Sequence, residues 1–193
     1  MSDKFKLLLK QIHFPQHEEA YNEIKSGSIE SVKLFKSKRQ WFFVFSFRNL
    51  LSYETFTLFD NLLHSSFDSL GAKVSYMINV EDISCDQSLL EAYFSYALDI
   101  LKSSHFSIYS LFSNLGIEIS NNSISVKAPA HILRENLHER FIALIADVLS
   151  NVGLSNVSIS VLEDKEASSS LEEAYETNKI SLQEEAESQA RQA

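Results

Sequence analysis

Hydrophobic positions in the chain recur first at helical spacing and then at strand spacing. The first apolar stripe lies in residues 4–13, and its members are Phe5, Leu8, Leu9 and Ile12. Pro15 ends this predicted helix because proline has no backbone N–H to donate. Residues 17–25 predict a second short helix, with Gly27 placed to close it as a left-handed cap. The chain therefore begins with a small helical pair.

Residues 29–35 and 41–47 alternate like two strands of a hairpin, joined by a polar, basic turn at residues 36–39. Aromatic side chains fill one face of the second strand, at Trp41, Phe43, Phe45 and Phe47. Phe42 and Val44 lie on its opposite face. Apolar residues on both faces predict a central strand that is covered on each side.

A helix begins after Ser52, a favourable N-cap, and Gly71 is placed to end it. Residues 74–80 then alternate as a third strand, which completes a β-β-α-β unit.

The same order of elements is predicted a second time. Its ranges are helices over 87–102 and 105–115, strands over 117–120 and 123–126, a long helix over 130–152 and a strand over 157–161. In the helix over 105–115 we expect inward side chains at Phe106, Tyr109 and Phe112, with Gly116 as its end. Duplication and coincidence both explain the repeat. We predict an α+β fold of two β-β-α-β units, each preceded by a helical pair.

Composition and charge divide the chain into four expected segments. They are a helical pair (1–27), a first half (28–84), a second half with its own helical pair (85–162) and an acidic linker (163–193), which is disordered or helical. The linker carries nine acidic and three basic residues, whereas the first 48 residues carry nine basic and five acidic ones. Whole-chain charge, −9, is therefore a poor guide to partners.

The N-terminal helix and the cysteine count predict a cytoplasmic location. Lysines interrupt the short apolar run of residues 4–13, which fits neither a signal peptide nor a membrane span. The single cysteine, Cys85, excludes an internal disulfide and fits a reducing compartment.

Candidate catalytic and metal sites are sparse. His131, Glu135 and His138 are spaced for one helical face and could ligate a metal, but an exposed polar face explains them better. The acidic residues Glu81, Asp82 and Asp86 could hold magnesium, but solvation and helix capping are the preferred interpretation. The sequence has no nucleotide-binding glycine loop and no G-x-S-x-G serine. We therefore predict neither a catalytic residue, a metal site nor a cofactor.

Basic and aromatic residues alternate around the first hairpin, at Lys33, Lys36, Lys38, Arg39, Trp41 and Arg48. This pattern is compatible with single-stranded nucleic acid, bound through phosphate contacts and base stacking. The preferred interpretation is that the aromatic side chains form core and the lysines a solvated edge. A protein-binding surface is the third option. The partner-binding candidates are Lys36, Lys38, Arg39, Trp41 and Arg48.

One stretch of the chain resembles a known family. The resemblance rests on three segments. They are SVKLFKSKRQWFFVFSF (31–47), NLLSYETFTLFDNLLHSSF (49–67) and LLEAYFSYAL (89–98). The anchor positions are Arg39, Trp41, Phe43, Leu50 or Leu51, Phe56, Phe59, Leu63 and Phe67. In order and pattern these residues resemble the N-terminal region of the PolC-type DNA polymerase III α subunit, the replicative polymerase of low-GC Gram-positive bacteria.

The resemblance implies a KH-like, non-catalytic docking module whose partner is the clamp-loader tau subunit. It also implies that polymerase and 3′-5′ exonuclease domains, with their magnesium and DNA, lie beyond Ala193. A KH-type Gly-x-x-Gly loop is missing, which argues against RNA binding by the KH mechanism. We expect the fragment to be monomeric and not to bind a membrane. A single-stranded nucleic-acid-binding module remains the alternative function, and a stand-alone enzyme using Glu81, Asp82 and Asp86 is a third.

Overall fold

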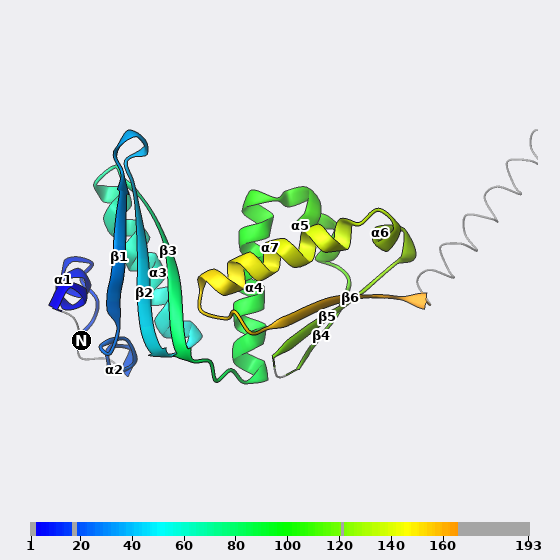
Figure 1. Cartoon of the computed structure of the whole chain (residues 1–193), viewed down its shortest axis with the longest axis horizontal. Coiled ribbons are helices and arrows are strands. Elements are labelled where there is room, and N and C mark those ends of the chain that lie inside the picture. The colour runs from blue at the N-terminus through cyan, green and yellow to red at the C-terminus, as the bar shows by residue number, and fades with distance from the viewer. Residues whose placement is uncertain (1–2, 17–18, 121, 166–193) are drawn as a thin grey trace, which may run out of the picture.

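The computed structural model describes residues 3–16, 19–120 and 122–165, and its fold is α+β (Figure 1). This described part contains seven α-helices and two separate three-stranded sheets. The predicted order of two helices followed by β-β-α-β is confirmed in both halves, and the second half adds one short helix. None of the described helices is long and apolar enough to cross a membrane. Most of the predicted linker, residues 166–193, lies outside the described residues.

The first half contains the predicted hairpin and the helix that covers it. Its elements are α1 (Asp3–Gln11), α2 (Glu19–Ile24), β1 (Ser28–Phe35), β2 (Gln40–Asn49), α3 (Tyr53–Ser69) and β3 (Lys73–Asp82). Strand β2 is central, antiparallel to β1 and parallel to β3. The Ser52 hydroxyl accepts a hydrogen bond from the Thr55 backbone N–H, which confirms the predicted N-cap. Gly71 adopts φ +62°, as a left-handed helix stop requires.

Only one face of the first sheet is covered, which corrects the prediction for β2. Phe43, Phe45 and Phe47 are buried, and the rings of Phe5 from α1 and Phe59 from α3 pack on them. On the opposite face, Phe42 and Val44 remain half-buried and do not join the hydrophobic core. The apolar residues on both faces of β2 predicted that helices cover both faces of the sheet. The described helices α1 and α3 pack on only one of them.

Gly27 does not cap α2, because its φ is not among the positive values. It is instead a point of close approach. A Cβ at this position would overlap the Phe47 ring and lie 2.8 Å from the Phe5 ring. The glycine thus lets the chain enter β1 directly beneath two aromatic side chains.

The second half repeats the arrangement with different capping. Its elements are α4 (Gln87–Ser104), α5 (Phe106–Phe112), β4 (Gly116–Ser120), β5 (Ser123–Ala128), α6 (Ala130–Arg134), α7 (Leu137–Asn151) and β6 (Ser158–Glu163). Strand β5 is central, antiparallel to β4 and parallel to β6. The hairpin turn includes Asn122 at φ +63°, as an asparagine turn predicts.

Three expectations for the second half are wrong. The long helix over 130–152 is two helices, because Asn136 adopts a left-handed φ of +55° between α6 and α7. Phe106 is 63% exposed, and Ile108 takes the inward position with Phe112. Gly116 is the first residue of β4 and does not end α5 in a left-handed conformation.

The two halves share one hydrophobic core. The Tyr93 hydroxyl of α4 donates a 3.0 Å hydrogen bond to the backbone oxygen of Leu51 in the first half. The Tyr93 ring also packs on Tyr53 and Phe56 of α3. Gly153, at φ +99°, lies against Val80 of β3, with no room for a Cβ. These contacts fix the second half against α3 and β3.

Candidate docking surface

The tip of the first hairpin presents the predicted basic residues. Lys36 and Lys38 lie in a short 3-10 turn (Lys36–Lys38), and both are exposed. Neither forms an ion pair with a described residue. Arg39 follows in a left-handed conformation with φ +48°. The tip therefore carries free positive charge on a defined turn.

Arg39 is also a structural residue. Its guanidinium donates a 3.3 Å hydrogen bond to the backbone oxygen of Leu70, and its own carbonyl accepts one of 2.9 Å from the Lys73 N–H. These contacts join the hairpin tip to the turn between α3 and β3. The position of Lys36 and Lys38 relative to the helix is thereby fixed.

Trp41 belongs to the covered face of the sheet. Its half-buried indole stacks on Phe43 with ring centroids 6.2 Å apart, and Phe67 meets it edge-on at 5.9 Å. The Trp41 ring therefore packs with the core, as predicted by the interpretation that the hairpin aromatics are core residues. The indole does not form a free stacking platform beside the lysines.

Arg48 lies far from the hairpin tip. It is exposed near the end of β2, eight residues after Gln40, which corresponds to about 26 Å along a strand. By alternation its side chain lies on the opposite face from Phe47. The structure thus groups Lys36, Lys38 and Arg39 and separates Trp41 and Arg48 from them.

Sequence reasoning missed an uncovered apolar face beside the tip. We call this the open face, and its apolar members are Phe35, Phe42, Val44 and Met77. Lys33 lies opposite Phe42 in the β1–β2 pairing, so positive charge adjoins the open face. Its sequence signal was the pair Phe42 and Val44, together with Met77 at the matching position of β3.

The second sheet provides an internal comparison. By the same alternation, its outer face carries Glu118, Ser125, Lys127 and Ser160, with Leu162 as its one large apolar member. Lys127 and Glu118 form an ion pair across this face. Two sheets of the same topology thus have different outer faces. The second is largely polar, whereas the open face carries four large apolar side chains among polar ones such as Gln40, Ser75 and Asn79. The apolar outer face marks the first sheet as the candidate interaction surface.

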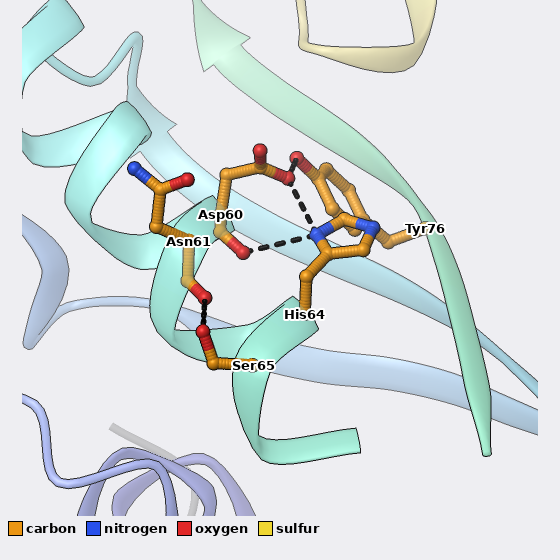
Figure 2. A network of polar contacts seen from close by, with 5 residues as sticks. All are labelled: Asp60, Asn61, His64, Ser65 and Tyr76. Carbon is orange, nitrogen blue, oxygen red and sulfur yellow. Dashed lines mark hydrogen bonds and ion pairs between the residues drawn. The ribbon is translucent and has the colours of Figure 1, made fainter. Parts of the chain in front are cut away.

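A polar network joins α3 to β3 on the covered side of the first sheet (Figure 2). The Tyr76 hydroxyl donates a 2.5 Å hydrogen bond to the Asp60 carboxylate, and His64 Nδ1 lies 3.0 Å from the same carboxylate. The hydrogen bond to Asp60 raises the pKa of the His64 imidazole, although partial burial opposes the shift. Burial raises the pKa of Tyr76 far above its ordinary range. This network is therefore a clamp between helix and strand and offers no activated nucleophile.

A small crevice opens between the two halves next to this network. Its volume is about 190 Å³, and its lining includes His64, Tyr76, Tyr96 and Asn151. Burial raises the pKa of Tyr96 to about 12, so its hydroxyl stays protonated at neutral pH. The crevice is small for a metabolite, because ligand pockets commonly exceed about 300 Å³.

The other chemical candidates are not assembled into a site. Glu135 follows the end of α6 and His138 belongs to α7, so the candidate ligands His131, Glu135 and His138 do not share one helix. Among the described residues, no three metal-binding side chains converge. Asp86 caps α4 by accepting from the Leu89 N–H at 2.8 Å, as its capping interpretation predicted. Burial raises the pKa of the Cys85 thiol, which lowers its reactivity.

Comparison with known protein families matches most of the chain, in two consecutive parts. The family model DNA polymerase III polC-type N-terminus I matches residues 4–78, from the start of α1 to a point within β3. The model DNA polymerase III polC-type N-terminus II matches residues 92–193 and begins within α4. Both descriptions agree with the family that the first hairpin resembles.

Curated relatives are similarly named. The chain is 28% identical over 193 residues to DNA polymerase III PolC-type of Streptococcus agalactiae strain NEM316, covering 100% of this chain and 13% of that protein. It is 24% identical over 182 residues to the Streptococcus pyogenes strain Manfredo protein of that name, covering 94% and 12%. For Streptococcus suis strain 98HAH33 the identity is 27% over 163 residues, covering 83% and 11%. The chain spans no more than 13% of the length of these relatives.

Proposed function

Because the chain belongs to the PolC-type DNA polymerase III family and matches its N-terminal region, we propose that it is a non-catalytic docking domain of a replicative DNA polymerase. Its role in this proposal is to hold the polymerase to another replication protein. Nucleotidyl transfer, 3′-5′ exonuclease activity, magnesium and DNA contact then belong to other parts of the polymerase.

The observation that carries the proposal is the contrast between the outer faces of the two sheets. The first sheet offers Phe42, Val44 and Met77 beside the basic tip, whereas the second offers mainly serines and an ion pair. An apolar patch rimmed by charge is typical of protein-binding surfaces. Lys36 and Lys38, which have no ion-pair partner in the described part, supply charge for attraction of an acidic partner.

The partner in this proposal is the tau subunit of the clamp loader, as the family resemblance implies. A docking domain on an acidic linker would keep the polymerase near tau at high effective concentration while leaving its orientation free. The proposed contact residues are Lys36, Lys38, Arg39 and Arg48 together with the open face, and Trp41 supports them from the core.

Binding of purified tau to the 193-residue chain tests this proposal. Substitution of Lys36→Glu with Lys38→Glu is expected to weaken binding at least tenfold and to reduce its dependence on salt. The matched control changes charge equally in the second half, with Lys102→Glu and Arg140→Glu, and should leave affinity within twofold. Equal loss in both variants, or no tau binding by the wild-type chain, contradicts the proposal.

The alternative of single-stranded DNA binding has weaker support. Base stacking needs an accessible ring, and the Trp41 indole is packed between Phe43 and Phe67. Titration of a labelled single-stranded oligonucleotide at low salt separates the two functions. Tight, salt-sensitive binding that the Lys36→Glu and Lys38→Glu changes abolish would favour the nucleic-acid function over docking.

A further inference from the structure

Strand β1 has an unoccupied hydrogen-bonding edge. It is the outermost strand of the β1-β2-β3 sheet, and every residue from Glu30 to Phe35 is exposed. Among the described residues, no helix or loop donates to or accepts from the backbone of residues 29–35 outside the β1–β2 pairing. In Figure 1 this strand lies toward one end of the molecule, with α1 beside its lower part and its upper part, near the hairpin tip, standing clear of α1. Its outer backbone groups are therefore available to another strand.

The side chains of this edge are unusually apolar for an exposed strand. Val32, Leu34 and Phe35 are 44%, 45% and 46% exposed. By alternation Val32 and Leu34 lie on the aromatic side of the sheet and Phe35 on the open face, so both surfaces of the edge are apolar. The described part of β6, another edge strand, exposes one large hydrophobic residue, Leu162. A lone exposed hydrophobic residue is ordinary, whereas three on one free edge indicate pairing.

The charge around this edge selects the chemistry of the pairing strand. Lys33 lies within β1, and Lys36 and Lys38 follow at its end. The one acidic residue of the strand, Glu30, is already engaged, because its carboxylate accepts a 2.8 Å hydrogen bond from the Asn79 amide. The free charge along the edge is therefore positive, and an acidic strand complements it.

We propose that β1 takes up an extended, acidic segment of a partner protein as a fourth strand of the first sheet. Main-chain hydrogen bonds would provide affinity. Apolar side chains on one face of the segment would contact Val32 and Leu34, and acidic side chains on its other face would contact Lys33. This inference rests on the proposed docking function and specifies how the partner is bound. The pairing residues of the chain are those from Glu30 to Phe35.

A second copy of the chain fits this edge less well. If two β1 strands paired antiparallel with Val32 facing Leu34, the two Lys33 side chains would lie directly opposite each other. Like charges in that position destabilise a strand pair. An acidic segment from another protein avoids this repulsion.

Hydrogen exchange of the 193-residue chain with two synthetic peptides tests the inference. The probes are blocked eight-residue peptides that alternate valine with glutamate or valine with lysine. The valine–glutamate peptide is expected to slow exchange of the outward-facing amides of residues 30–35 at least fivefold, and the lysine peptide to have no effect. Leu34→Lys should abolish the protection, whereas Leu162→Lys on β6 is the matched control and should preserve it.

Each other outcome overturns the inference. Absence of protection by the glutamate peptide, equal protection by the lysine peptide, or concentration-dependent dimerisation through β1 would do so. Tau binding measured with the same variants separates this inference from the docking function. If tau binds the Leu34→Lys and wild-type chains equally, docking stands and the edge-pairing inference is wrong. If the valine–glutamate peptide protects β1 and tau does not bind, the edge-pairing inference stands and the proposal that tau is the partner is wrong.

Discussion

The Tyr93 hydroxyl donates a hydrogen bond to the Leu51 carbonyl, and this 3.0 Å contact joins the second half of the chain to the first. Tyr93 is fully buried, so its hydroxyl has no access to water. Leu51 is itself 4% exposed and follows β2 directly before the N-cap of α3. The bond therefore satisfies two groups that would otherwise be buried without partners.

Loss of this bond should destabilise the whole described part. Tyr93→Phe leaves the Leu51 carbonyl buried and unpaired, so we expect the free energy of unfolding to fall by about 1–3 kcal/mol. Urea unfolding should remain a single transition, because both halves share one core. Tyr109→Phe on α5 is the control and should change stability by less than about 0.5 kcal/mol. Separate unfolding of two halves in the wild-type chain would contradict the shared core.

Gly153 should tolerate no side chain. Its φ of +99° disfavours alanine, and a Cβ would overlap the Val80 side chain of β3. We expect Gly153→Ala to lower the melting temperature, with a loss of about 2–4 kcal/mol from strain and displaced packing. Gly116→Ala is the matched control, because its nearest neighbour, Lys127 Cβ, would be 3.9 Å away. A harmless Gly153→Ala would mean that β3 and the end of α7 do not touch.

The two faces of β2 predict opposite outcomes for similar substitutions. Phe45 is fully buried against Phe5, Phe43 and Phe59, so Phe45→Ala should cost about 3–5 kcal/mol of stability. Phe42→Ala on the open face should cost less than about 1.5 kcal/mol, because Phe42 is outside the core. Chemical denaturation measures both. Equal losses would show that the open face is covered, as the strand pattern alone had suggested.

Stability should depend on pH through His64. The folded-state pKa of this imidazole is raised above its ordinary value of 6.5, mainly by its hydrogen bond to Asp60. Its contribution is therefore fully present below pH about 6.5 and is lost as pH rises through the higher folded-state pKa. The stability difference between wild type and His64→Gln should be larger at pH about 5.5 than at pH about 8.5. Because His64 is partly exposed, added salt should reduce this difference.

The matched control for His64 is Asp60→Asn. This substitution removes the carboxylate, so the additional stabilisation of the His64 imidazolium at low pH should largely disappear. Asp68 also raises the pKa of His64, so a small residual difference is expected. An unchanged difference in the Asp60→Asn background would place the titrating group elsewhere.

Local patterns allowed most elements to be predicted from the sequence. The apolar stripe of α1, the Ser52 and Asp86 caps and the alternation of β2 each depend on neighbours within a few residues. Where the predictions failed, long-range packing decided the outcome. Glycine is required at position 27 because the rings of Phe5 from α1 and Phe47 from β2 pack against it. The neighbouring sequence does not reveal where these two rings lie.

The candidate surface was only partly predictable for the same reason. Lys36 and Lys38 were predicted at the tip, because a polar turn between two strands is a local signal. The position of Phe42 and Val44 outside the core was not predicted, because it depends on which face of the sheet α3 and α1 cover. Alternation places residues on faces but does not state how many faces are covered.

The polar attachment of Tyr93 to Leu51 also has a mechanical consequence. In Figure 1, β1 and the C-terminal end of β6 lie toward opposite ends of the molecule. A pull between a strand bound at β1 and the chain at Lys165 would load the two sheets in series. The hydrogen bond from Tyr93 to Leu51 and the contact of Gly153 with Val80 would then share the tension between the two halves.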